Sequence, residues 1–343
     1  MDAVAFQRRN GFQVQERDVE IVAGLFECRI MERRHIAQVY FCGKMEAAKK
    51  RLQALCSAQL IKIVNPTRAV TVSAIYSLGK AGFDLLQSEG RLRRYEETCG
   101  EQFVRKRCTQ NHAVSVLTLA HELAVMDVKA AFCESLRQRP DYRIVEFTTW
   151  PRLYEIHIEG DHLPDGCPRL LRPDGFVHLE RSVGEKRLSQ FFFLEVDRAT
   201  ESQAILIKKI EGYTRHNCSP AFTRFVTGDE GGTPIPFRTL MIFLGPHGQG
   251  TEERLFNHAH WLSRFKPPLP RASFWLTTLA ALGENLLGNI WICPEDYQGA
   301  LAGTAFDPCQ VDWKPHGRVT GRDALVRSRA IRRTLLPTSE PPT

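Results

Sequence analysis

The sequence predicts an α+β protein of two domains, and three observations support this prediction. The length of 343 residues suits roughly two or three domains, and 43% hydrophobic with 25% charged residues is a globular composition. Apolar residues recur at helical spacing up to residue 58, and two β-prone runs follow. Beyond residue 111, strands and helices follow one another in an order that favours a mixed sheet with flanking helices.

Charge is distributed unevenly along the chain. Residues 1–110 hold 19 Lys and Arg against 12 Asp and Glu, while the whole chain carries a net charge of +7. Residues 111–313 are acidic, with 20 basic against 25 acidic residues, and the segment from Lys314 onward is basic again, with 7 against 2. A basic module joined to an acidic one suggests a head that binds a polyanion and a body with another task.

The composition also predicts where the protein works. No apolar stretch approaches the roughly 18 residues that a membrane span needs, and residues 1–10 lack the apolar core of a signal peptide. The ten cysteines are scattered singly, without a Cys-x-x-Cys pair, so we expect reduced thiols. We therefore expect a cytoplasmic protein that makes no membrane contact.

Three helices are predicted in the first domain, which we place at residues 17–95 after an extension over residues 1–16. They are expected at residues 17–31, 32–41 and 44–58. The pair Cys42-Gly43 separates the second helix from the third. The third helix turns Ala47, Leu52 and Leu55 inward and leaves basic residues on or beside its open face.

Two β-prone runs follow the third helix, at residues 60–64 and 70–78, and Asn65-Pro66-Thr67-Arg68 forms the turn between them. They predict a hairpin, closed by a short amphipathic helix at residues 80–90. A helix-turn-helix followed by such a hairpin is a winged helix. Its second helix has the size to enter the major groove of DNA.

Basic side chains on this helix and its wing are suited to neutralising phosphates. The candidates for DNA contact are Lys44, Lys49, Lys50, Arg51, Lys62 and Arg68. Lysines mostly supply salt-dependent affinity that is independent of sequence, whereas Arg51 or Gln53 has the chemistry to read base edges. We expect double-stranded DNA as the partner. The alternative is a solvated face on a protein-interaction module.

A charged stretch over residues 96–110 predicts a linker to the second domain, which we place at residues 111–315. That domain is expected to begin with a long helix over residues 111–138. The further elements are strands at 143–149, 170–178, 188–197, 240–245 and 273–278 and helices at 201–214 and 252–264. Residues 316–343 predict a basic, partly disordered tail that is frayed from residue 335.

Acidic residues mark two of the predicted strands. Pro173-Asp174 lies on one strand and Glu195-Val196-Asp197 on the next, so a hairpin would bring the carboxylates together. Because side chains alternate along a strand, Glu195 and Asp197 point to one face. We expect Asp174, Glu195 and Asp197 to bind Mg²⁺ or Mn²⁺, which prefer oxygen ligands and can activate water for phosphodiester hydrolysis.

The helix after these strands presents Lys209 and Tyr213 on one stripe. A lysine there could orient the attacking water or stabilise the developing phosphate charge. The candidate catalytic set is therefore Asp174, Glu195, Asp197, Lys209 and Tyr213. The opposing interpretation is a surface hairpin whose acids pair with Arg172, Arg198 and Lys209.

This arrangement resembles the PD-(D/E)xK nuclease superfamily, whose motif has Pro-Asp and then Glu-x-Lys on the next strand. Here Asp197 takes the place of the motif lysine. The resemblance implies an α/β restriction-endonuclease-like domain with a mixed central sheet, in which Lys209 from the adjacent helix replaces the lysine. Whether the chain is a magnesium-dependent DNA endonuclease is left open by Asp197.

Residues 15–265 resemble the replication-relaxation family of bacterial plasmids and integrative elements. The most specific parts are Glu195-Val196-Asp197-Arg198 with Thr200-Glu201, and Ile75-Tyr76-Ser77-Leu78 with Gly82. The resemblance implies a bacterial DNA-binding protein that acts in plasmid replication, DNA relaxation or mobilisation. Two interpretations stay open: a metal-dependent nuclease, or a non-enzymatic transcriptional or replication regulator whose second domain serves dimerisation or docks a replication or mobilisation protein.

Overall fold

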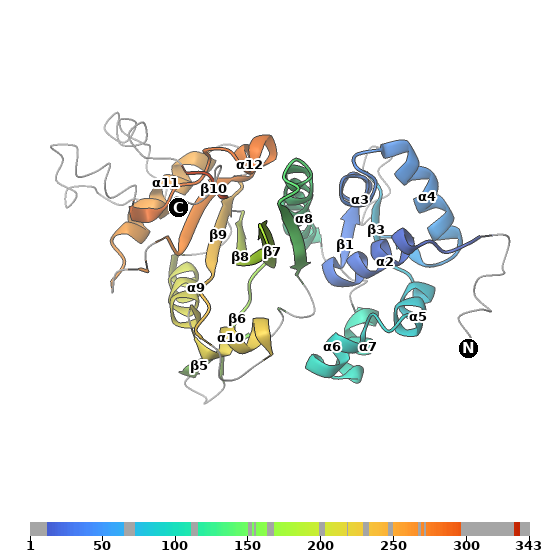
Figure 1. Ribbon diagram of the computed structural model, residues 1–343, viewed down its shortest axis with the longest axis horizontal. Coiled ribbons are helices and arrows are strands. Elements are labelled where there is room, and N and C mark those ends of the chain that lie inside the picture. Colours follow the sequence, from blue (N-terminus) through green and yellow to red (C-terminus); the bar gives the residue numbers. More distant parts are fainter. Residues whose placement is uncertain are drawn as a thin grey trace. The chain divides into compact units, whose positions relative to one another are not determined.

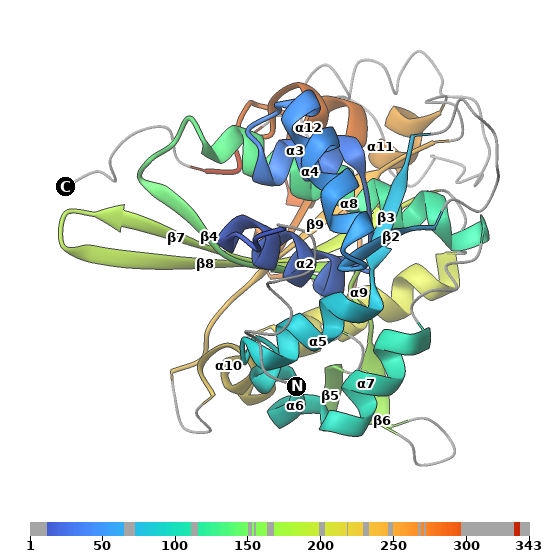
Figure 2. The same cartoon turned by 90° about the vertical axis from the view of Figure 1, so that its right-hand side faces the viewer.

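The structure is a computed structural model. It describes residues 12–64, 73–110, 116–149, 153, 156–162, 168–198, 203–217, 219–228, 233–245, 250–266, 269–270, 272–295 and 333–336. The chain folds into two compact units. The first comprises Met1–Glu155 with Asp174–Phe176, and the second comprises Ile156–Pro173 with Val177–Thr343. Figures 1 and 2 draw the elements of both units, which form the mixed α+β structure that the sequence predicts.

The first unit begins with three helices and a small antiparallel sheet. The helices are α2 (Glu16–Cys28), α3 (Arg33–Tyr40) and α4 (Met45–Ser57), which confirm the three predicted helices. The strands are β1 (Ile30–Glu32), β2 (Ile61–Ile63) and β3 (Ile75–Leu78), in the order β1-β3-β2. Helix α5 (Lys80–Ser88) follows β3. The described ends of the predicted hairpin are therefore paired as expected.

Strand β1 was not predicted, because the first helix was expected to run to residue 31. Arg29 has a positive φ of 64°, which ends the helix at Cys28. Ile30 and Met31 are fully buried and pair with Ser77 and Tyr76 of β3. Ile30 and Met31 continue the helical spacing of apolar residues in the sequence. Their packing in the sheet nevertheless decides their conformation.

Close packing of α5 against the segment between α4 and β2 explains one glycine of the first unit. A Cβ atom at Gly82 would lie 2.2 Å from the carbonyl oxygen of Leu60, so only glycine fits at this position. On α4 itself, Ala48, Leu52 and Leu55 are fully buried. The prediction of Ala47 on the inner face was wrong, since Ala47 is exposed and the buried stripe follows i, i+4, i+7 from Ala48.

Residues 96–110, predicted as a linker, are helical except for Gly100. They lie in α6 (Arg93–Cys99) and α7 (Glu101–Gln110). Helix α8 (Val116–Leu136) and strand β4 (Tyr142–Thr148) also lie within the first unit, although the sequence analysis placed both in the second domain. Polar contacts tie α8 to the preceding elements: Arg29 Nη1 lies 2.6 Å from Glu122 Oε1, and His35 Nε2 lies 2.9 Å from Asp127 Oδ1.

The larger sheet has the strand order β10-β9-β8-β7-β4. Its other strands are β7 (Gly175–Val183), β8 (Lys186–Asp197), β9 (Arg238–Phe243) and β10 (Phe274–Thr278). Strand β9 runs parallel to both β8 and β10, while β7 and β8 form a hairpin, so the sheet is mixed as predicted. A separate antiparallel pair consists of β5 (Ile156–His162) and β6 (Pro168–Leu171).

Helices α9 (Gln203–His216), α10 (Pro220–Thr227), α11 (Thr251–Ser263) and α12 (Leu279–Asn285) complete the second unit (Figure 1). The first and third confirm the helices predicted at 201–214 and 252–264. The core of the unit includes an aromatic cluster in which the ring of Phe193 lies 4.7 Å from Phe237 and 5.6 Å from Phe222. Among the described residues, no helix has the length and apolar character to cross a bilayer.

Part of the predicted tail is packed. Arg333 forms an antiparallel bridge with Trp291, and Leu335 and Leu336 are both 1% exposed. The prediction of a chain frayed from residue 335 was wrong at these two leucines, because burying them removes two large apolar side chains from water. The remainder of residues 316–343 lies outside the described residues.

Candidate functional site

The open face of α4 carries two of the lysines proposed for DNA contact. Because one side of α4 is buried, its opposite side faces the solvent. Lys49, Lys50 and Gln53 are exposed on that side. Within the described part of the chain, no ion pair engages Lys49 or Lys50. The face therefore presents two adjacent solvated positive charges next to an amide that can donate and accept hydrogen bonds.

The other lysine candidates differ in exposure. Lys44 is exposed at the N-cap of α4. Lys62, on β2, is partly covered, and this burial lowers its pKa. Arg68 and the rest of the turn Asn65-Pro66-Thr67-Arg68 lie outside the described residues. The structure thus brings Lys44 and the two lysines of α4 onto one helix and leaves Lys62 on a neighbouring strand.

Arg51 turns away from the open face. Its Nε donates to Oδ1 of Asp18 at 2.8 Å, a second guanidinium nitrogen pairs with the other carboxylate oxygen, and Nη2 also donates to the carbonyl of Gln13 at 2.8 Å. Asp18 is fully buried. A bidentate pair with a buried carboxylate ties α4 to the start of α2, which is a structural role.

At the end of β8, the structure brings three of the predicted catalytic residues together. Lys209 Nζ lies 2.7 Å from Glu195 Oε2, and the hydroxyl of Tyr213 donates to Oε1 of the same carboxylate. Glu195 is 6% exposed and Tyr213 is 1% exposed. Lys209 thus reaches Glu195 from the adjacent helix α9, as expected.

Asp197 is paired separately, with an arginine that the sequence analysis did not select. Arg254 of α11 donates to both carboxylate oxygens, from Nε at 2.5 Å and from Nη2 at 3.1 Å. His258 Nδ1 lies 2.7 Å from the carbonyl oxygen of Arg254. Burial lowers the pKa of His258, so this imidazole is held in its neutral form. Both oxygens of Asp197 are thus engaged within the fold.

Asp174 belongs to the first unit, where its Oδ1 lies 2.9 Å from Nε2 of His121 on α8. Among the described residues, no group of three or more His, Cys, Asp or Glu side chains could hold a metal ion. Glu195 and Asp197 each direct their oxygens at protein donors. Protein donors therefore occupy the oxygens of Glu195 and Asp197 that were expected to bind Mg²⁺ or Mn²⁺.

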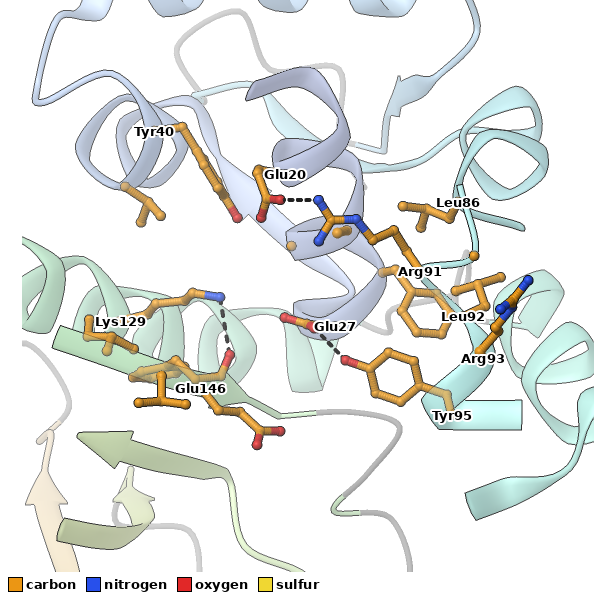
Figure 3. Close-up of a pocket in the computed structure, with 18 of the residues that line it drawn as sticks. Glu20, Glu27, Tyr40, Leu86, Arg91, Leu92, Arg93, Tyr95, Lys129 and Glu146 are labelled. Atoms are coloured by element: carbon orange, nitrogen blue, oxygen red, sulfur yellow. Dashed lines mark hydrogen bonds and ion pairs between the residues drawn. The ribbon is translucent and has the colours of Figure 1, made fainter. Parts of the chain in front are cut away.

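A cavity of about 670 Å³ lies within the first unit (Figure 3). Lys129, which is 6% exposed, lines it and donates to Sγ of Cys28 at 3.2 Å and to the carbonyl of Phe147 at 3.3 Å. Nearby, the hydroxyl of Tyr95 donates to Glu27, as the dashed line shows. The described residues that line this cavity include none of the predicted DNA-contact or catalytic residues.

A comparison with protein families matches residues 23–224 to the replication-relaxation family, which is more than half of the chain. The chain belongs to the replication-relaxation family. The family description suggests a role in plasmid replication or relaxation. No curated protein and no solved structure matches the chain.

The family match includes the open face of α4 and the pair formed by Glu195 and Lys209, but it ends before Arg254. Sequence reasoning missed Asp18 and Arg254, because their partners lie 33 and 57 residues away in the chain. Asp18 stands at the third position of α2, where an acidic residue is typical of a capping box. Nothing in the sequence around Arg254 indicates its pairing with Asp197.

Proposed function

We propose that this member of the replication-relaxation family binds double-stranded DNA through α4, with the first unit acting as a winged helix. The observation that carries the proposal is the exposure of Lys49 and Lys50, without an ion-pair partner in the described residues, on a helix whose other face is buried. An α-helix fits the major groove, and unpaired lysines are free to replace counterions along the phosphates.

The order of elements supports the same proposal. Helices α3 and α4 are joined by the short turn from Phe41 to Lys44, and the antiparallel strands β2 and β3 follow directly. In winged helix-turn-helix proteins this order places the second helix of the pair against the duplex. The basic excess of residues 1–110, with 19 Lys and Arg against 12 Asp and Glu, adds long-range attraction to a polyanion.

We further propose that the protein serves plasmid replication or relaxation as a non-enzymatic DNA-binding factor. Glu195 is engaged by Lys209 and Tyr213, and Asp197 by Arg254, so these buried acids stabilise the second unit. Buried charges that are paired in this way are what a folded core requires. The second unit then provides a scaffold for dimerisation or for a replication protein.

The test is duplex binding by the full chain, followed by fluorescence anisotropy at about 0.1 M salt. Replacing Lys49→Ala and Lys50→Ala together should weaken binding roughly tenfold, because two phosphate contacts are lost. The matched control is Lys208→Ala with Lys266→Ala, which removes two exposed lysines of the second unit. If both double variants bind as tightly as the wild type, the assignment of α4 is wrong.

A second candidate function is metal-dependent cleavage of DNA, and one observation favours it. Lys209 reaches Glu195 from the adjacent helix, at 2.7 Å, where the resemblance to the PD-(D/E)xK superfamily implies a lysine. Supercoiled plasmid is incubated with the protein and Mg²⁺ or Mn²⁺, beside an Asp174→Ala and Glu195→Ala double variant. Cleavage by the wild type alone would establish the nuclease, and equal retention of supercoiled plasmid would exclude it.

A further inference from the structure

The hairpin of β7 and β8 extends beyond the strand that flanks it in the second unit. Strand β9 pairs with β8 only from Phe192 onward, so the first six residues of β8 have no partner from β9. Figure 2 shows β7 and β8 running side by side to a tight turn. Gly184 in this turn has a φ of 59°, which favours glycine over residues with a side chain.

The tip of this hairpin is open to solvent on both faces. Residues Lys186, Arg187, Leu188 and Ser189 are all exposed, although side chains alternate between the two faces of a strand. Arg187 is 67% exposed and Leu188 is 47% exposed. A strand that is packed on a core has one buried face, and this segment has none.

Cross-strand contacts link β7 to β8 along the hairpin. His178 of β7 lies 3.0 Å from the hydroxyl of Ser189 on β8, and its ring lies 4.5 Å from that of Phe191. Arg187 Nη1 lies 3.4 Å from Glu180 Oε1. These contacts make the segment a two-stranded ribbon. The ribbon is a continuation of the larger sheet, which anchors it at its base.

The exposed charge on the ribbon favours a polyanion. Lys186 and Arg187 supply two exposed positive charges, Arg181 beside them is half-buried, and Glu185 is an exposed acid of the same turn. Glu180 is only 12% exposed and already pairs with Arg187. Leu188 shares a strand face with Lys186, so an apolar side chain lies beside a cation, as in ribbons and wedges that enter a groove of DNA.

We propose that the tip of this hairpin, residues 181–188, is a second contact with double-stranded DNA. A two-stranded ribbon has the width that the major groove admits. Lys186 and Arg187 bind phosphates at the groove edge, and Leu188 contacts the groove. This inference rests on the proposed function of the first unit as a DNA-binding module, and it adds a contact from the second unit.

The experiment uses the full chain and the same duplex. Lys186→Ala with Arg187→Ala should weaken binding roughly tenfold at about 0.1 M salt and lower the slope of log K against log salt by about 2. Lys186→Ala alone, which leaves the Arg187–Glu180 pair intact, should lower the slope by about 1. The control is again Lys208→Ala with Lys266→Ala, and thermal unfolding verifies that each variant is folded.

The outcomes separate the two proposals. If the wild type binds duplex and both hairpin variants bind with the same affinity and slope, the hairpin is not a DNA contact and its open surface is left for a protein partner. If the wild type does not bind duplex DNA at all, both the proposed function and this inference are wrong. A reduced slope in both hairpin variants, with the control unchanged, supports the second contact.

Discussion

The lysines of α4 and the charged residues at the end of β8 differ in how their charges are compensated. Lys49 and Lys50 are exposed and have no ion-pair partner among the described residues. Lys209, by contrast, forms an ion pair with the carboxylate of Glu195, a residue that is 6% exposed. A solvated lysine can exchange water and counterions for a phosphate at little cost in free energy. A charge in a buried pair can bind a ligand only if it first gives up its partner, which costs much more free energy.

This difference teaches which of the two regions can bind a ligand through its charges. The open face of α4 already has the form that a polyanion requires. The acids of β8 would have to give up Lys209, Tyr213 or Arg254 before binding a cation. We therefore propose a binding role for the first region and a structural role for the second.

The largest expected effect concerns Asp197. Asp197→Ala removes the acceptor of two charge-assisted hydrogen bonds from the half-buried guanidinium of Arg254, so it should lower the free energy of unfolding by about 4 kcal/mol. Urea denaturation of wild type and variant measures the change. The control is Asp141→Ala, whose pair with Arg139 is partly exposed and should change stability by less than about 1 kcal/mol.

A different outcome for Asp197→Ala would break the comparison. Active sites often sacrifice stability for function, so removing a catalytic acid can stabilise a protein. If the variant is as stable as the wild type or more stable, Asp197 is not a structural residue. The nuclease interpretation would then gain support.

A pH dependence tests whether the second unit is closed to water. His216 packs among Phe193, Phe222 and Phe237, and burial lowers its pKa to about 4. Since the unfolded chain binds a proton near its pKa of about 6.5, stability should fall as the pH drops from about 6.5 to 4, by about 3 kcal/mol in total.

His216→Phe isolates this contribution, because carboxylates titrate over part of the same range. Between pH 7 and pH 4, the free energy of unfolding of the variant should fall by about 3 kcal/mol less than that of the wild type. Equal pH dependence in the two proteins would mean that His216 is protonated in the folded state and that this core admits water.

Arg51 gives a smaller effect and separates structure from binding within the first unit. Arg51→Ala leaves Asp18 buried without its cation, but Asp18 keeps the hydrogen bond from the backbone of Gln15 at 2.8 Å. We expect a loss of about 2 kcal/mol in unfolding free energy, with the salt dependence of DNA binding unchanged. A folded variant with a reduced salt slope would show that Arg51 contacts DNA.

Local patterns allowed much of the fold to be predicted. Helices α2, α3 and α4 follow from apolar residues at helical spacing, and the strands β8, β9 and β10 follow from β-prone runs. Strand β1 could not be predicted, because Ile30 and Met31 continue the helical pattern and only pairing with β3 makes them a strand. The inclusion of α8 in the first unit could not be predicted, because its contacts with distant residues, such as that of Glu122 with Arg29, are not visible in the order of residues.

The candidate site was predictable to a similar degree. The spacing of Lys209 and Tyr213 on one helical stripe predicted their approach to the acids, and both contact Glu195. The pairing of Asp197 could not be predicted, because Arg254, a residue 57 positions away, takes both of its oxygens. Ion pairs between distant elements depend on tertiary packing, and no local spacing encodes them.

The central claim is that the exposed lysines of α4 bind the phosphates of duplex DNA. The most direct measurement is the slope of log K against log salt for the wild type and for Lys49→Ala with Lys50→Ala. The account predicts a steep fall of affinity with salt in the wild type and a slope smaller by about 2 in the variant. Identical slopes for the two proteins would contradict the claim.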